Sequence, residues 1–94
     1  MRHTDHAERA AASRSIPLAD VIGAAQERLD AHRIAVETAD AAVLVGYTDD
    51  GWQGFSNGNV VWAIIRDGVL ATVMFRREDQ PSTPAALRVR TVIA

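Results

Sequence analysis

Apolar positions repeat at helical spacing in the first third of the chain and at strand spacing after it. One helical stripe begins after the cap candidate Ser15 and runs to about His32. Pro17 lies in its first turn, where the missing N–H costs nothing. The stripe is formed by Leu18, Val21, Ile22, Ala25 and Leu29. This segment is therefore predicted to be an amphipathic helix that buries one face.

A shorter helix is predicted before it. Thr4 is a residue type that caps helix N-termini, and it precedes a helical segment from about Asp5 to Ala12. The small face of this segment is formed by Ala7, Ala10 and Ala11.

From residue 34 onward the pattern is that of strands. Residues 34–40 are predicted to be a short strand or a loop into one, and residues 41–47, which are apolar, a strand. The strands VVWAII and VLATVMF are joined by Arg66-Asp67-Gly68, a strong turn signal. Residues 87–93 alternate Arg88 and Arg90 with apolar residues, which predicts an edge strand.

The strand after the turn has two alternating faces. The better candidate for the core is the face of Val69, Ala71, Val73 and Phe75. The other face carries Leu70, Thr72, Met74 and Arg76.

This order of elements predicts one α+β domain over residues 1–94, helical in 1–33 and a sheet in 34–94. Two N-terminal helices would pack on one face of a three- to four-stranded antiparallel meander sheet. The opposite face would be left open as a mixed surface of Trp62, Leu70, Thr72, Met74 and Arg76.

Composition narrows the classes of function. The 94 residues include no cysteine, which excludes disulfides and thiolate metal sites, and the net charge of −2 argues against a general nucleic-acid binder. Residues 1–50 hold nine acidic residues and five Arg, whereas residues 51–94 hold three and five. We expect a cytoplasmic protein without a membrane partner, because no apolar run approaches the roughly 20 residues that cross a bilayer.

All ten basic residues are Arg, whose planar guanidinium suits bidentate contact with phosphate or carboxylate groups. Arg76 and Arg77 end the last hairpin strand and are followed by Glu78-Asp79. Arg76 and Arg77 are either a mutually neutralised, solvated strand end or part of a phosphate site. In the second case, Arg66 and Arg77 would bind the phosphate.

His6-Ala7, followed by Arg14-Ser15-Ile16, forms one short patch, and Thr72–Arg76 forms another. The first resembles the His-Ala … Arg-Gly-Ile opening of small RelE/BrnT-like toxins, within the barnase-, EndoU-, colicin- and RelE-like ribonuclease domains. The second resembles the strand of their closing hairpin. The likeness extends over most of the chain in element order. It implies a toxin-type endoribonuclease that uses no metal or other cofactor.

Metal-free RNA cleavage removes a proton from the 2′-hydroxyl, protonates the 5′-leaving oxygen and stabilises a charged phosphorane. The resemblance implies His6 as the acid–base group, because imidazole exchanges protons near neutral pH. It implies Arg14 and Arg76 as catalytic phosphate donors, with Thr72 as a hydrogen-bond donor nearby. These groups meet only if the first helix crosses the end of the sheet; otherwise His6 is a solvated imidazole.

An alternative function is a non-catalytic protein-binding module. Ala10 and Ser15 stand where the toxin family usually has Arg and Gly, and the net charge is negative. The contact patch would then be Trp62, Leu70 and Met74 on the open sheet face. The candidate partners are RNA and an antitoxin for the enzyme, and a host protein or a second copy of the chain for the binding module.

Overall fold

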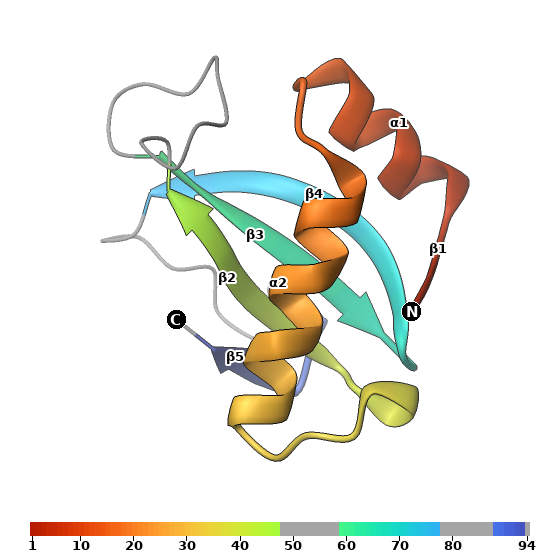
Figure 1. The fold of residues 1–94 in the computed structure, drawn as a ribbon, viewed down its shortest axis with the longest axis vertical. Helices are drawn as coiled ribbons and strands as arrows, with labels where there is room; N and C mark the ends of the chain where they lie inside the picture. Colours follow the sequence, from red (N-terminus) through yellow and green to blue (C-terminus); the bar gives the residue numbers. More distant parts are fainter. Residues whose placement is uncertain (48–58, 78–87, 94) are drawn as a thin grey trace.

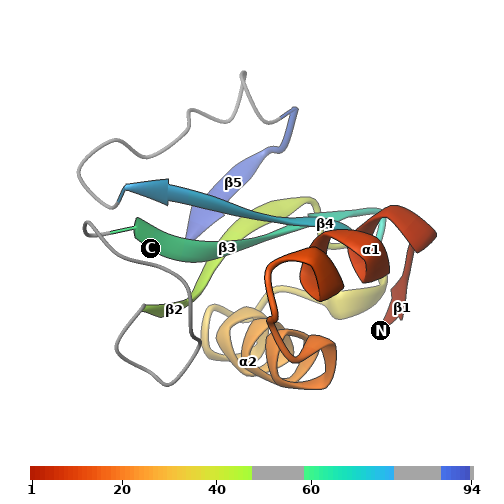
Figure 2. The same ribbon diagram turned by 90° about the horizontal axis from the view of Figure 1, so that it is seen from above.

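Two helices lie on one side of a five-stranded sheet in the computed structural model, which describes residues 1–47, 59–77 and 88–93 (Figures 1 and 2). In chain order, the elements are β1 (Arg2–His3), α1 (Asp5–Ser13), α2 (Leu18–Ala31), the 3₁₀ helix η1 (Val36–Thr38), β2 (Ala41–Tyr47), β3 (Asn59–Arg66), β4 (Val69–Arg77) and β5 (Thr91–Ile93). The strands lie in the order β1-β4-β3-β2-β5. The predicted α+β class, with both helices before the main strands, is confirmed.

The sheet is mixed, and the prediction of a purely antiparallel meander is wrong. The strands β2, β3 and β4 do form an antiparallel meander, but β1 is parallel to β4 and β5 is parallel to β2. The two polar residues of β1 carry no apolar pattern, so the sequence gives no sign of this strand. Thirteen residues, 78–90, separate β4 from β5, a length that permits the crossover that parallel pairing requires.

The helix caps match the prediction at α1 but not at α2. Thr4 caps α1 by accepting the Ala7 N–H at 3.0 Å. Ser15 caps nothing, because α2 begins after Pro17 without a side-chain cap. Instead, Ser15 has a φ of 55°, and the following N–H of Ile16 donates to the Ala11 carbonyl at 2.9 Å. Ser15 therefore ends α1 in the left-handed conformation that glycine usually adopts at this position.

The apolar stripe of α2 packs against the sheet as predicted. Val21, Ala25 and Leu29 are fully buried, and Leu18 and Ile22 are partly buried against the same cluster. This main core lies between the helices and the sheet, which Figure 2 shows edge-on. Full burial of a Leu or Val side chain stabilises the fold by about 1.5–3 kcal/mol.

A β-bulge in β4 changes which side chains enter this core. Ile65 pairs with Leu70, but Ile64 pairs with Thr72, so Ala71 is an extra residue in β4. A bulge shifts the alternation of faces by one residue. Leu70 and Val73 consequently lie in the main core, and the predicted face that joined Val69 and Ala71 to Val73 is wrong. Leu70 was expected on an open surface but is completely buried.

The second face of the sheet is also buried, so the predicted open face is wrong there too. A second apolar cluster on this face consists of Ala42, Leu44, Val60, Trp62, Ile64 and Val89, with Met74 and Val92 partly buried against it. Trp62 is only 2% exposed. The sequence carried a sign of this, because β2 and β3 are apolar at consecutive positions, a pattern typical of strands buried on both faces.

Candidate functional site

A groove lies between α1 and β4, and it is the one place in the described structure where several predicted site residues meet. It has a volume of about 470 Å³. Its helical wall is formed by His6, Arg9, Ala10, Ser13 and Arg14, and its strand wall by Thr72, Val73 and Met74. Two segments that are at least 58 positions apart in the sequence therefore form a single concave surface.

The helical wall results from the spacing of residues along α1. Ala7, Ala10 and Ala11 are buried, and their small side chains let the helix approach β4 closely. His6, Arg9 and Ser13 follow at intervals of three and four, so they form a stripe beside this buried face. The acidic residues of α1 lie outside the groove lining. One of them is Glu8, whose Oε2 lies 3.4 Å from Nε2 of His3. The two side chains form an ion pair when the histidine is protonated.

His6 and Arg9 supply the reactive groups of the helical wall. Both side chains are exposed, and within the described part of the chain neither has a hydrogen-bond or ion-pair partner. An imidazole and a guanidinium thus line the same hollow, and none of the described residues that line it is a carboxylate. This arrangement attracts an anion and places a proton-exchanging group beside it.

Arg14 is at the rim of the groove and is held by the end of α1. Its Nη1 donates to the Ala10 carbonyl at 3.3 Å and to the Ser13 Oγ at 3.4 Å. A cation here satisfies carbonyl groups that the helix end leaves unpaired. Arg14 therefore has a structural role at the helix terminus and places a positive charge at the rim of the groove.

Thr72 and Met74 give the strand wall a mixed character. The Thr72 Oγ1 donates weakly to the Val73 carbonyl at 3.4 Å, and the side chain is half-buried. Met74 is also half-buried and has one side against the second apolar cluster. The wall thus offers a hydroxyl and an apolar surface opposite the basic stripe.

Other predicted site residues are not brought to this groove. Arg66 is exposed at the turn end of β3, paired in the ladder with Val69, and does not line the groove. The backbones of Arg76 and Arg77 extend β4 beyond Met74, but their side chains lie outside the described residues. Trp62 and Leu70 are in the two apolar clusters, so of the predicted contact patch Met74 alone lines the groove.

Arg9 was not among the residues singled out in the sequence. The signal was present, because Arg9 follows His6 by three positions and therefore shares its face of a helix. The toxin family usually has an arginine four positions after its histidine, where this chain has Ala10. In the structure Ala10 is 7% exposed and packs in the core, and Arg9 supplies the guanidinium of the helical wall.

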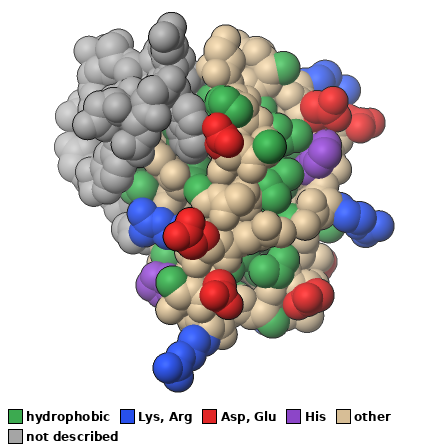
Figure 3. All heavy atoms as spheres, in the orientation of Figure 1, with side chains coloured by type: hydrophobic (Ala, Val, Ile, Leu, Met, Phe, Trp, Pro, Cys, Tyr) green, Lys and Arg blue, Asp and Glu red, His purple; other side chains and the backbone are tan. Residues whose placement is uncertain are grey.

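The positive character of the groove is local. On the face of the molecule in Figure 3, the arginines and carboxylates of the described residues are interspersed. Among these residues, no group of three His, Asp or Glu side chains is arranged to hold a metal ion. No helix in the described ranges is long and apolar enough to span a membrane.

Comparison of the chain with models of protein families, with curated proteins and with solved structures gave no match.

Proposed function

We propose that the groove between α1 and β4 cleaves RNA, and that the protein is a small, toxin-type endoribonuclease that needs no metal ion. One observation carries this proposal: His6, Arg9, Arg14 and Thr72 line a single hollow. An imidazole can transfer a proton, and a guanidinium beside it can stabilise the charge of the phosphate.

In the proposed reaction, the RNA supplies its own nucleophile. The neutral imidazole of His6 accepts the proton of the 2′-hydroxyl while the 2′-oxygen bonds to the adjacent phosphorus. The bond between phosphorus and the 5′-oxygen breaks, and water protonates the departing oxygen. The products are a 2′,3′-cyclic phosphate and a 5′-hydroxyl, without any change in oxidation state.

Arg9 stabilises the phosphorane in this proposal. Two N–H groups of one guanidinium can donate to two non-bridging oxygens, and the charge on those oxygens is greatest in the transition state. Arg14 strengthens the local potential from the rim. Arg76 and Arg77 remain proposed phosphate contacts, since β4 continues towards them from the groove.

A local site explains how a chain with a net charge of −2 could hold RNA. Among the described residues, the groove lining has three basic or imidazole side chains and no carboxylate, so a short stretch of backbone phosphates would be attracted there although the whole molecule is acidic. The resemblance to RelE/BrnT-like toxins supports the same placement of His6, Arg14 and Thr72.

The proposal is tested by incubating the protein with a 5′-labelled, mixed-sequence 20-nucleotide RNA in the presence of EDTA. His6→Ala should lower the cleavage rate by about 10²–10⁴-fold, the usual contribution of a general acid–base group. Arg9→Gln should lower it by about 10–10³-fold, because one donor to the transition-state charge is lost. His32→Ala and Arg90→Gln are matched controls, since both residues are exposed and lie outside the groove.

Two results would support the proposal: products that carry a 2′,3′-cyclic phosphate, and no cleavage of DNA of the same sequence. Wild-type protein that leaves RNA intact would overturn it, as would equal rates for His6→Ala and His32→Ala. The competing function would then be a non-catalytic module that binds a protein partner through this basic groove, because Leu70 and Trp62 are buried.

A further inference from the structure

The two walls of the groove are joined at one side chain. We infer that Thr4 is a positioning residue, whose hydroxyl sets the placement of the helical wall against the strand wall. Its effect on catalysis rests on the proposed function, but its effect on geometry does not.

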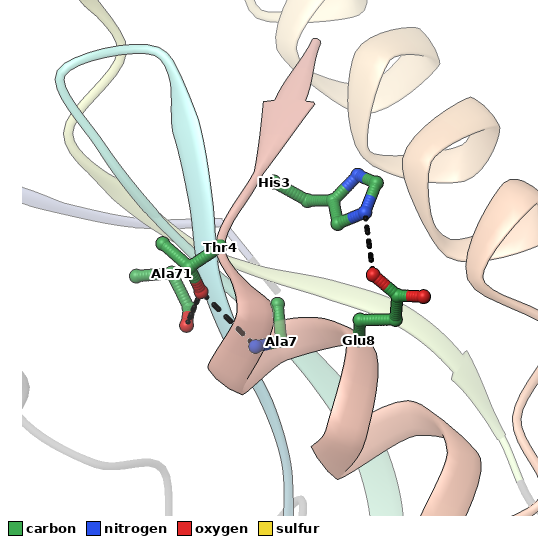
Figure 4. Close-up of polar contacts among 5 residues, drawn as sticks. All are labelled: His3, Thr4, Ala7, Glu8 and Ala71. Atoms are coloured by element: carbon green, nitrogen blue, oxygen red, sulfur yellow. Dashed lines mark hydrogen bonds and ion pairs between the residues drawn. The ribbon is translucent and has the colours of Figure 1, made fainter.

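Thr4 lies between β1 and α1 and bonds to both sides of the groove, as Figure 4 shows. Its Oγ1 accepts the Ala7 N–H at 3.0 Å, which fixes the first turn of α1. The same oxygen donates its own proton to the Ala71 carbonyl of β4 at 2.8 Å. One hydroxyl therefore uses its donor and one acceptor position on two different elements.

The partner in β4 is the residue that the bulge inserts. Ala71 has no counterpart in β3, because the ladder passes from Leu70 directly to Thr72. The hydroxyl of Thr4 supplies a hydrogen bond to the carbonyl of this extra residue, whose loss would be costly in a half-buried setting. The cap of the helix and the bend of the strand thus depend on the same side chain.

The groove residues lie immediately beside these bonds. His6 is two positions after Thr4 at the start of α1, and Thr72 directly follows Ala71. A change in the Thr4–Ala71 contact would therefore alter the separation of His6 from the strand wall. Displacements of about 1 Å in a catalytic group can lower rates by about 10²-fold.

Other contacts at this junction do not replace the hydroxyl. The backbone N–H of Thr4 donates to the Leu70 carbonyl at 3.0 Å and holds the chain near β4, but it does not orient α1. The His3–Glu8 pair is a second link between β1 and α1 (Figure 4). Its side chains are 34% and 64% exposed, and such pairs contribute little.

Three substitutions separate the two bonds of Thr4. Thr4→Ser keeps both. Thr4→Asp keeps the cap, because a carboxylate accepts the Ala7 N–H, but an ionised carboxylate has no proton to donate to Ala71. Thr4→Val has the same shape as threonine and loses both. Ile93→Val, in β5 at the opposite edge of the sheet from β1, serves as a control whose stability is lowered away from the groove.

The first measurement is the rate of RNA cleavage. Thr4→Asp should keep its helical circular dichroism and a KM within about threefold of wild type, while kcat falls by at least about tenfold. Thr4→Ser, which keeps both hydrogen bonds, should have the wild-type kcat. The inference would be overturned if Thr4→Asp kept the wild-type kcat, or if Ile93→Val lost as much kcat as Thr4→Asp.

The second measurement detects geometry without activity. Because the chain has no cysteine, a spin label on Ser13→Cys is unique, and its broadening of the Thr72 and Val73 amide signals reports the separation of α1 from β4. Thr4→Asp should change this broadening and Thr4→Ser should not. An unchanged pattern in Thr4→Asp would overturn the positioning role, whereas inactive wild-type protein would overturn only the proposed reaction.

Discussion

At the scale of single residues, the fold depends on positions such as Gly68, where an added Cβ would clash with the backbone of a neighbouring segment. Gly68, in the turn between β3 and β4, has a φ of +75°, and its N–H donates to the Ala39 carbonyl at 3.0 Å. A Cβ at this position would lie 2.5 Å from the Glu37 carbonyl oxygen. The turn therefore requires glycine both for its conformation and for its contact with η1.

Two alanine substitutions test this requirement. Gly68→Ala should destabilise the protein by more than about 1 kcal/mol, because the new methyl group meets backbone atoms and the φ is unfavourable. Gly23→Ala should instead stabilise it by about 0.5–1 kcal/mol, because Gly23 is inside α2 and a Cβ there meets nothing within 4 Å. Urea denaturation measures both changes, and equal effects of the two substitutions would contradict the account of the turn.

At the scale of elements, the position of α1 depends on its small buried face. Ala7 and Ala11 are at most 1% exposed, and they let the helix lie close enough to β4 to form one wall of the groove. Larger side chains would hold the helix away, even though they would strengthen its apolar character. The packing of α1 on β4 thus depends on the small size of these alanine side chains and not on large apolar ones.

Adjacent alanines provide a matched test of this packing. Ala11→Leu should destabilise the protein by about 1–3 kcal/mol, since the added carbons have no space between helix and sheet. Ala12→Leu should change stability by less than about 0.5 kcal/mol, because Ala12 is exposed. Chemical denaturation distinguishes the two, and a neutral Ala11→Leu would show that α1 is not closely packed.

The elements also show what could be foreseen from the sequence. Both helices were predictable because an apolar or small stripe at helical spacing is a local signal, and Thr4 marks the start of α1. The faces of β4 were not, because a single inserted residue, Ala71, reverses the alternation without leaving a mark in the pattern. The strand β1 was missed because two residues are too few to show any period.

At the scale of the whole molecule, the sheet is buried on both faces, which moves the candidate site from a face to an edge. The expected open surface placed Trp62 and Leu70 in contact with a partner, but the two apolar clusters enclose them. The groove instead lies where α1 flanks β4, the strand that the short β1 borders on its outer side (Figure 1). The family resemblance singled out His6, Arg14 and Thr72, which all line the groove, whereas Arg9 was not singled out although its spacing from His6 places it on the same helix face.

The groove between α1 and β4 is the place where we propose that this protein holds a nucleic-acid backbone. The most direct measurement is an amide chemical-shift titration of the wild-type protein with a ten-nucleotide DNA strand, which lacks the 2′-hydroxyl and cannot be cleaved by the proposed reaction. The largest shifts should occur at Arg9, Ser13, Thr72 and Met74, and binding should weaken steeply with salt. Absence of binding, or shifts centred on the Asp67–Gly68 turn at the other end of the hairpin, would contradict this proposal.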